Sequence, residues 1–244
     1  MIKNNPLVEC NHIWKAFPTG EGNLSVLEDV HFSLTKGEFF VILGQSGGGK
    51  STLLRVLGGF EPPDRGEVLL DQVPVRQPGR DAVMIFQSFD QLFPWYTLKQ
   101  NLIYALKKTG AESDRSKAAA EAEIYLNLTG LTDFANAFPY QLSGGMKQRG
   151  ALARALILQP RLLLMDEPFS SLDFLTKKEA IRNIKHLHDK IGTTILLVTH
   201  DIDEAIELGT TIAVLSRERH RFIFQKKNFP QKIQKTELET LFHY

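Results

Sequence analysis

Cysteine is nearly absent from this chain, since Cys10 is the only one among 244 residues. No disulfide can therefore form within it, which fits a reduced compartment, and we expect Cys10 to be a small, half-buried apolar residue.

Long apolar runs are missing too: the longest, at residues 39–43 and 162–165, fall far short of the roughly 20 residues that a bilayer span requires. The N-terminus lacks the apolar stretch and cleavage site of a secretory signal. We therefore expect neither export nor a membrane span, and any role at a membrane would need another chain to cross it.

Neither sign of charge dominates the sequence. Lysine and arginine number 29 against 28 for aspartate and glutamate, and the 43% apolar and 23% charged fractions are typical of globular proteins. A neutral balance gives no general support for binding nucleic acid or acidic substrates. The exception is residues 217–244, where seven basic side chains oppose three acidic ones and give a net charge of +4. We interpret this basic segment as a solvated strand and terminal helix, and contact with anionic lipid head groups or a partner remains the alternative.

The pattern of apolar residues predicts an α/β fold. Apolar bursts at residues 38–43, 161–165 and 194–198 have the length of buried parallel strands, and each is followed by a helix-like segment. Shorter strand-like segments predict an antiparallel β layer, at residues 7–17, 24–34, 67–70 and 73–75. Helical periodicity marks residues 98–108, 113–129 and 143–158. We predict one domain over residues 1–244, in which residues 1–88 and 159–244 form the α/β core and residues 89–158 form an inserted α-helical subdomain.

A glycine-rich segment directly follows the first apolar burst. Its residues fit the pattern G-x-x-x-x-G-K-[ST] at every fixed position, namely Gly44, Gln45, Ser46, Gly47, Gly48, Gly49, Lys50 and Ser51, with Thr52 behind them. The glycines allow the backbone N–H groups of residues 47–50 to point at a phosphate beside the amino end of a helix. Lys50 supplies a positive charge toward the β- and γ-phosphates, and Ser51 is placed to bind Mg²⁺. We therefore expect residues 44–52 to hold the phosphates of a nucleotide.

Two adjacent carboxylates follow the second apolar burst, at Asp166 and Glu167. On its own an apolar run that ends in Asp-Glu is a weak signal, but together with the phosphate loop it becomes a strong one. Adjacent carboxylates can divide the work of hydrolysis: Asp166 would hold Mg²⁺ through a water, and Glu167 would orient and polarise the water that attacks the γ-phosphate. The sequence thus predicts a nucleotide-hydrolysing site at the carboxyl ends of the strands.

A further segment precedes the helix predicted at residues 143–158, with the sequence Leu142-Ser143-Gly144-Gly145-Met146-Lys147-Gln148-Arg149. Ser143 and the amides of Gly144 and Gly145 would offer a second site for a phosphate. This octet resembles the signature motif of ATP-binding cassette (ABC) proteins. The resemblance implies a P-loop NTPase (RecA-like) core, ATP and Mg²⁺ as cofactors, and a head-to-tail homodimer in which the signature covers ATP held by the opposite subunit. It runs from about residue 7 to residue 215 and weakens in the basic segment, where the glycine-containing strand turn usual in the family is not found.

The same resemblance implies roles for four more residues. Gln87 matches the Q-loop, with a part in catalysis and in binding the metal, and Asp173, in Ser170-Ser171-Leu172-Asp173, matches the D-loop at the nucleotide. His200 matches the switch histidine, which joins Lys50 and Glu167 as a catalytic residue and contacts the γ-phosphate. Phe17 lies where the family places an aromatic residue, usually tyrosine, that stacks on adenine. Trp14 is the competing candidate for that stacking role.

Two strings resemble importers of the nitrate, sulfonate and taurine group, at residues 88–95 and 200–205. The resemblance implies the ATP-hydrolysing subunit of an importer for a small anion, held at the cytoplasmic face of a membrane by permease subunits and working with an extracytoplasmic solute-binding protein. The apolar cluster of Leu92, Phe93, Trp95 and Tyr96 would then either pack the helical insertion onto the main sheet or form a groove for a permease coupling helix. Several related importers continue into a regulatory domain, whereas this chain stops at Tyr244, so we expect no regulation by such a module.

Two other classes of ABC protein remain as alternatives. An exporter or lipid-handling complex would share the same nucleotide motifs. A soluble ATPase that acts on nucleic acid or ribosomes is less favoured, because no coiled coil, zinc-binding insertion or second cassette is visible, and we expect no nucleic-acid partner. The pair His186 and His188 is not expected to bind a metal, because residues two apart on a helix point in different directions, and we expect both on the surface.

Overall fold

The structure is a computed structural model that describes residues 5–20, 22–87, 91–112, 114–170, 172–228 and 233–242. Several residues of the predicted motifs lie outside these ranges, namely Ser88, Phe89, Asp90, Ser113, Ser171 and Lys232. Among the described residues, no helix combines the length and the hydropathy that crossing a bilayer requires.

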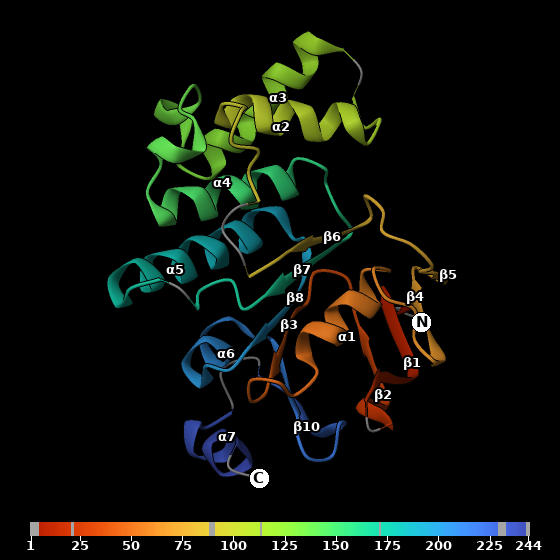
Figure 1. Cartoon of the computed structure of the whole chain (residues 1–244). Coiled ribbons are helices and arrows are strands. Elements are labelled where there is room, and N and C mark those ends of the chain that lie inside the picture. The colour runs from red at the N-terminus through yellow and green to blue at the C-terminus, as the bar shows by residue number, and fades with distance from the viewer. Residues whose placement is uncertain are drawn as a thin grey trace.

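Two sheets form the framework of the protein (Figure 1). The antiparallel sheet has the strand order β2-β1-β4-β5 and contains β1 (Val8–Thr19), β2 (Gly22–Leu34), β4 (Arg65–Leu70) and β5 (Val73–Pro74). The larger sheet has the order β10-β9-β3-β8-β7-β6 and contains β3 (Phe39–Leu43), β6 (Ala82–Ile85), β7 (Leu162–Asp166), β8 (Thr194–Thr199), β9 (Thr211–Leu215) and β10 (Phe222–Lys227). Its strands run parallel except for β10, which is antiparallel to β9.

Seven α-helices are described beside these sheets. They are α1 (Lys50–Leu57), α2 (Leu98–Lys108), α3 (Arg115–Leu128), α4 (Gly144–Leu156), α5 (Phe174–Ile191), α6 (Ile202–Leu208) and α7 (Lys235–Phe242). Two short 3₁₀ helices, at Thr132–Phe134 and Pro139–Gln141, connect α3 to α4. The architecture confirms the predicted α/β fold with an antiparallel layer, and α2, α3 and α4 fall where helical periodicity predicts them.

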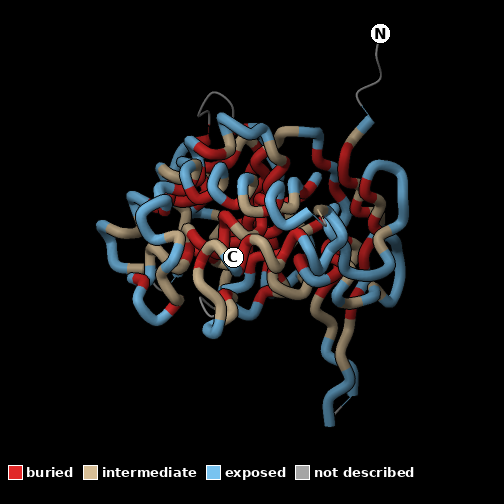
Figure 2. Tube along the Cα trace, turned by 90° about the horizontal axis from the view of Figure 1, so that it is seen from above, coloured by how far each residue is buried: buried red, intermediate tan, exposed pale blue. Residues whose placement is uncertain are grey.

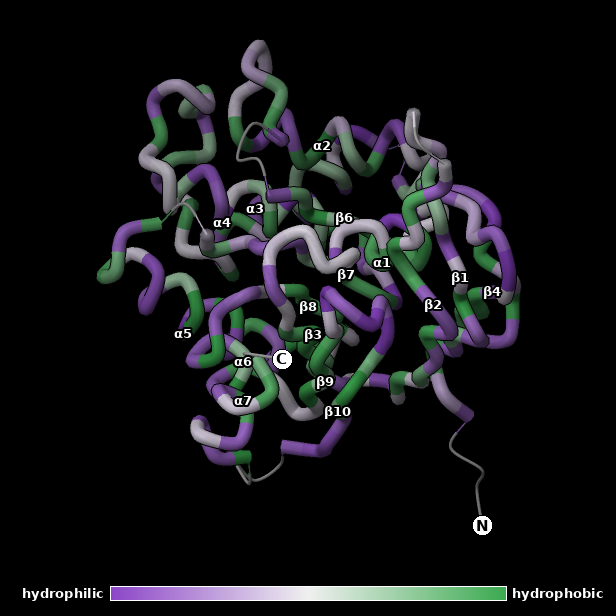
Figure 3. The backbone as a smooth tube through the Cα atoms, turned by 60° about the horizontal axis from the view of Figure 1, so that its bottom comes forward, coloured by the Kyte–Doolittle hydropathy of each residue, from purple (hydrophilic) through white to green (hydrophobic). Residues whose placement is uncertain are grey.

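The alternation of side chains along the parallel strands separates two cores. Phe40 and Ile42 of β3 face α1 and the antiparallel sheet, while Phe39, Val41 and Leu43 face α4, α5 and α6. Helix α1 therefore lies between the two sheets (Figure 1). Figure 3 shows the resulting band of hydrophobic strands through the centre of the molecule. Both faces of the large sheet are covered, which explains why its strands read as continuous apolar runs.

A third core belongs to the helical insertion, formed by apolar residues of α2, α3 and α4 together with Leu92, Leu131 and Leu142 of the connecting segments. These helices lie together above the larger sheet in Figure 1. Buried residues concentrate in the centre of the molecule in Figure 2, from which the hairpin of β1 and β2 projects as an exposed pair of strands.

The turn between β9 and β10 forms without the glycine that the sequence lacks there. His220 takes a left-handed conformation, with φ of 52°, and the N–H of Ser216 donates to the carbonyl of Arg221. A non-glycine residue at positive φ carries strain, which the strand pairing on either side holds in place. The basic segment thus contains a strand and a helix, β10 and α7.

Candidate functional site

Three neighbouring strands end at one edge of the larger sheet, and each delivers part of the site. In the strand order, β8 lies between β3 and β7. The glycine-rich loop follows β3, Asp166 and Glu167 end β7, and His200 follows β8. Because parallel strands present their carboxyl ends at the same edge, residues more than 100 positions apart meet there.

Backbone conformation explains the glycines of the loop. Gly47 and Gly49 have φ of 76° and 87°, in the left-handed region that other residues rarely adopt. A Cβ on Gly49 would also approach the carbonyl oxygen of Val26 to 2.7 Å. Gly49 caps the amino end of α1, so the loop passes directly into the helix that begins at Lys50.

Not every N–H group of the loop is free to meet a phosphate. The N–H of Gly48 donates to the carbonyl of Gln45 at 3.2 Å, which closes a turn inside the loop. The side chain of Gln45 donates to the carbonyl of Phe242 in α7 at 2.9 Å, and its contact with the nucleotide stays a prediction. Ser46 and Gly47 are exposed, and Thr52 is half-buried in α1.

The ammonium group of Lys50 is buried within the loop. Its Nζ donates to the carbonyl oxygens of Gly44 and Gln45 at 2.8 and 2.9 Å and lies 3.2 Å from Oε1 of Glu167. Lys50 is only 4% exposed, so these three oxygens replace the water that the charge has lost. The loop thus fixes a positive charge beside the carboxylate that follows β7.

Ser51 and Asp166 form an oxygen pair suited to a hard cation. The hydroxyl of Ser51 donates to Oδ1 of Asp166 at 2.9 Å. Burial raises the pKa of the Asp166 carboxyl, an effect that the Ser51 hydrogen bond partly offsets. Hydroxyl and carboxylate oxygens are the donors that Mg²⁺ prefers, so the residues present fit that ion.

Glu167 is held in an unusual backbone conformation at the end of β7. Its φ is 43°, and its N–H donates to the carbonyl of Val198 in β8 at 3.0 Å. The two carboxylate oxygens have different partners: Oε1 lies near Lys50, and Oε2 lies 2.9 Å from Nδ1 of His200. The backbone strain and the two partners together fix the direction of this side chain.

The segment that carries His200 is braced by charged residues that the sequence analysis did not single out. Lys177 of α5 lies 2.6 Å from Asp201 and 2.6 Å from Glu204, and Thr199 donates to Glu204 at 2.5 Å. Burial raises the pKa of Glu204, which is 3% exposed, despite the opposing effect of Lys177. Spacing in the sequence gives no sign of Lys177, because its partners lie 24 and 27 positions away.

Gln87 lies after β6 and its side chain is directed at the loop that follows Glu167. Its Nε2 donates to the hydroxyl of Ser170 at 3.3 Å, and that hydroxyl donates to the carbonyl of Glu167 at 3.0 Å. Gln87 is exposed. The structure therefore connects Gln87 to the carboxylate loop rather than to Ser51 and Asp166.

Ser143 caps the amino end of α4, where its hydroxyl accepts a hydrogen bond from the N–H of Met146 at 3.3 Å. Ser143 and Gly144 are exposed, and Gly145 is half-buried. Asp173 likewise caps α5 by accepting from the N–H groups of Leu175 and Thr176. The side chain and backbone of Thr176 hold the pKa of Asp173 below its ordinary value. Both predicted nucleotide contacts thus have a local structural role within one chain.

Gln148, in the signature octet, joins the helix that follows the signature to the loop that follows Glu167, a contact that no sequence motif indicates. Gln148 of α4 is buried, and its Nε2 donates to the carbonyl of Pro168 at 2.6 Å. Among the described residues, nothing partners its Oε1. Gln148 therefore links the signature helix to the loop directly after Glu167.

The two candidates for the adenine-stacking residue differ in their surroundings. The ring of Phe17 is half-buried on β1, and Nζ of Lys15 lies 5.2 Å from its centroid. Trp14 is 37% exposed and pairs with Arg65 of β4. Both remain predictions for the contact with the base.

Two minor expectations about burial are corrected by the structure. His188 does not lie on the surface: its Nε2 is 3.1 Å from the carbonyl of Gly37 and its ring packs edge-on against Phe39, because this side of α5 covers the sheet. His186 is exposed, as expected. Cys10 is fully rather than half buried, since it points from β1 into the core below the antiparallel sheet.

A phosphate loop on a parallel sheet, with paired carboxylates at the neighbouring strand end, defines a P-loop nucleotide hydrolase. A family model described as ABC transporter matches residues 27–170. The chain belongs to the ABC transporter family, and it is an ATPase of the ABC type.

The chain is similar to proteins of known role along most of its length. It is 39% identical over 213 residues to the nitrate import ATP-binding protein NrtD of Synechococcus elongatus, covering 87% of this chain and 77% of that protein. It is 43% identical over 197 residues to the taurine import ATP-binding protein TauB of Rhizobium johnstonii, covering 81% and 74%. A solved dimeric ATP-binding cassette in a post-hydrolysis state, bound to ADP and phosphate, superposes with a TM-score of 0.78 at 32% identity and covers 90% of this chain and 98% of that one.

Proposed function

We propose that this chain is the ATP-hydrolysing subunit of a membrane importer for a small anion of the nitrate, sulfonate and taurine group. The observation that carries the proposal is the array of Lys50, Glu167 and His200, which assembles one half of a hydrolytic site within a single chain. The relatives named as nitrate and taurine import proteins support the direction of transport and the class of solute.

In this proposal, each residue acts on a nucleotide held at the carboxyl edge of the sheet. Lys50 leaves the carboxylate of Glu167 to neutralise the β- and γ-phosphates, which frees Glu167 to accept a proton from the attacking water. His200 donates from its ring to the γ-phosphate and reports its presence. Mg²⁺, held by Ser51 and Asp166, would supply charge neutralisation between the phosphates, and Gln87 would have to leave Ser170 to join it.

The other half of the site is proposed to come from a second copy of the chain. Ser143 and Gly144 are exposed at the amino end of α4, where helix N–H groups favour an anion. In a head-to-tail pair they would cover the phosphates bound by Lys50 of the partner, and Asp173 would lie at the same interface. The dimeric state of the solved ADP-bound cassette supports this arrangement. Hydrolysis then removes the contact between the γ-phosphate and Ser143 and lets the pair open.

The proposed docking surface for the permease lies on the helical insertion. Leu92 is buried in the core of the helices, so packing accounts for part of the predicted apolar cluster. Trp95 is 65% exposed, and its ring stacks on Phe93 at 5.4 Å between centroids. Beside these rings a cavity of about 360 Å³ is lined by residues of β6, α2 and α4, including Tyr104 and Arg154. An exposed aromatic ring next to a mostly apolar cavity suits a short helix of a membrane subunit.

The proposal places the protein at the cytoplasmic face of a membrane, bound to permease subunits and supplied by an extracytoplasmic solute-binding protein. It is tested by co-purifying the chain with its natural membrane partner, reconstituting the complex in vesicles and measuring ATP hydrolysis with nitrate, taurine or an alkanesulfonate at the capture side. Stimulation by one of these anions, absent in the Glu167→Gln complex, is the expected result. Hydrolysis stimulated only by a solute on the nucleotide side would favour an exporter and overturn the proposal.

A further inference from the structure

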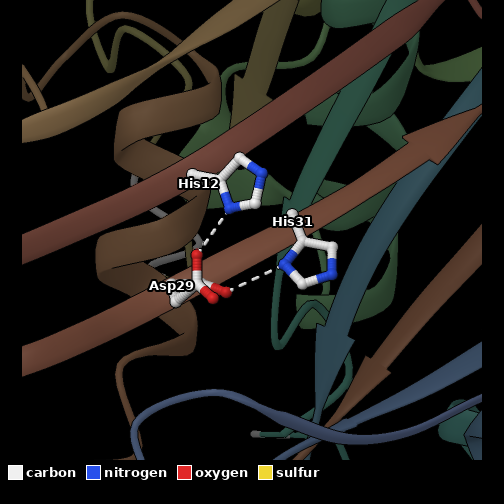
Figure 4. Close-up of side chains that lie close together, drawn as sticks. All are labelled: His12, Asp29 and His31. Carbon is white, nitrogen blue, oxygen red and sulfur yellow. Dashed lines mark hydrogen bonds and ion pairs between the residues drawn. The ribbon is translucent and has the colours of Figure 1, made fainter.

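Three metal-binding side chains meet on the outer face of the antiparallel sheet, away from the nucleotide site. Within the described part of the chain, His12, Asp29 and His31 form the one group of three such residues whose ligand atoms all lie within 4.8 Å of one another. Figure 4 shows both rings directed at Asp29, with His12 on β1 and the other two residues on β2.

Two irregularities in strand pairing create this cluster. Cys10 pairs with Phe32 and Ile13 with Val30, so two residues of β1, including His12, lie opposite His31 alone. The next pair, Lys15 with Leu27, leaves two residues of β2, including Asp29, opposite a single residue of β1. Each bulge turns an extra side chain outward, and together they put His12, Asp29 and His31 on one face.

The two bulged residues have strained backbone conformations. His12 and Asp29 both have positive φ, 51° and 54°, although neither is glycine. Gly66 of β4 makes room for the first bulge, because a Cβ there would collide with the carbonyl oxygens of residues 11 and 12. His12 and Asp29 therefore have strained backbone conformations opposite each other, and both carry side chains that can bind a metal. This combination indicates a role for this face beyond that of a solvated strand edge.

The three groups are in direct contact with one another. Nδ1 of His12 lies 2.6 Å from Oδ1 of Asp29, and Nδ1 of His31 lies 3.1 Å from the carbonyl of Asp29. The two imidazole rings are 5.1 Å apart and tilted by 34°. In a tetrahedral zinc site, ligand atoms about 2.0–2.1 Å from the ion lie roughly 3.4 Å from one another, so small rotations of exposed side chains suffice to enclose an ion.

From this juxtaposition we propose that His12, Asp29 and His31 bind a divalent transition metal of the zinc class, bridging β1 and β2. Two imidazoles and one carboxylate are a common ligand set for zinc and its neighbours, and they leave at least one position open. That position faces solvent beside a cavity of about 540 Å³ that Asp29 and His31 line together with Arg219 and Arg221. The two arginines repel a bare cation, so the affinity is expected in the micromolar range, with water or a small anion as the remaining ligand.

The test uses metal-free, nucleotide-free protein titrated with ZnCl₂ in calorimetry and with CoCl₂ in visible spectroscopy. The wild-type protein is expected to bind one zinc ion at this face, to show the cobalt absorption of a nitrogen- and oxygen-ligated ion, and to melt at a higher temperature with zinc. His12→Asn, which suits the positive φ, and His31→Gln are each expected to lower the zinc affinity by about 100-fold or more, since the loss of even an outer-shell partner costs 10–100-fold.

Two controls separate this site from other histidines. His186→Ala removes an exposed histidine of α5 and is expected to leave zinc binding unchanged. His200→Ala removes the histidine of the nucleotide site, and the zinc-dependent rise in melting temperature must persist there. Equal zinc affinity in the wild-type, His12→Asn and His31→Gln proteins overturns the proposal, as does a wild-type protein without zinc binding in the micromolar range.

Discussion

Nδ1 of His200 lies 2.9 Å from Oε2 of Glu167, so a residue that follows β8 holds the carboxylate that follows β7. The same carboxylate is held from its other oxygen by Lys50. A base paired with two donors is poorly placed to accept a proton from water. In the proposed mechanism, binding of a triphosphate would therefore draw Lys50 and His200 away from Glu167 before it accepts a proton.

Glu167→Gln is expected to retain ATP binding and to lower the rate of hydrolysis by about 10²–10⁴-fold, the usual contribution of a general base. The amide keeps the shape of the side chain but cannot take a proton. Turnover is measured by phosphate release and binding by a fluorescent ATP analogue, with His186→Ala as the unaffected control. Hydrolysis at the wild-type rate would contradict the role assigned to Glu167.

A head-to-tail pair is expected to bring Ser143 of one subunit against the phosphate loop of the other. In the Glu167→Gln protein, adding Ser46→Cys and Ser143→Cys should give a disulfide-linked dimer with ATP and magnesium, but not without nucleotide. Cross-linking is read from the mass on a non-reducing gel, and each single cysteine variant is the matched control. A chain that stays monomeric under these conditions argues against the shared site.

Lys177→Met is expected to lower the free energy of unfolding by about 2–4 kcal/mol near pH 7, because Glu204 keeps a buried charge without its cation. Lys177 is 23% exposed, so the loss is less than for a fully buried pair. The folded-state pKa of Glu204 lies above its unfolded value, so the native protein takes up a proton first as the pH falls. The deficit should therefore shrink from pH 7.5 toward pH 5.

Urea denaturation at the two pH values measures this effect. Lys178→Met is the matched control, because Lys178 is exposed on the same helix, with its Nζ 4.3 Å from the ring centroid of Phe174. A deficit that stays constant between pH 5 and pH 7.5 would show that the loss comes from packing rather than from the charge of Glu204.

Cys10 is expected to resist thiol reagents in the folded protein. Burial raises the pKa of its thiol far above the ordinary value, and Sγ lies 3.7 Å from the carbonyl of Val30. The thiolate is the reactive form, so modification requires the strand to open. Reaction with a chromogenic disulfide should be slow in buffer and complete within the mixing time in denaturant. Fast reaction in buffer would indicate that β1 opens readily.

The parts of the fold that depend on local pattern are readable from the sequence. The apolar runs of β3, β7 and β8 and the periodic helices α2 and α4 are predicted at nearly their observed positions. The glycine-rich loop is equally well predicted, because the positive φ angles within it favour glycine. Burial of whole strands and steric limits on the chain act over a few residues, so they leave a local signature.

The partners of the functional side chains are not readable in this way. The glycine-rich motif predicts a nucleotide contact for Gln45 but gives no sign of its hydrogen bond to the carbonyl of Phe242, nearly 200 positions away. The hydrogen bond from Gln148 to the carbonyl of Pro168, which joins a helix to a distant loop, is equally absent from the sequence pattern. The bulges that expose His12 and Asp29 arise from the register between β1 and β2. These features are set by the tertiary arrangement, and a sequence pattern carries no trace of them.

The hydrogen bond from Gln45 to the carbonyl of Phe242 has a practical consequence for anyone handling the protein. A purification tag or fluorescent fusion attached after α7 would extend from a helix whose last turn accepts a hydrogen bond from the loop that we propose to bind phosphate. Such an addition would be expected to disturb nucleotide affinity without altering a single residue of the active centre.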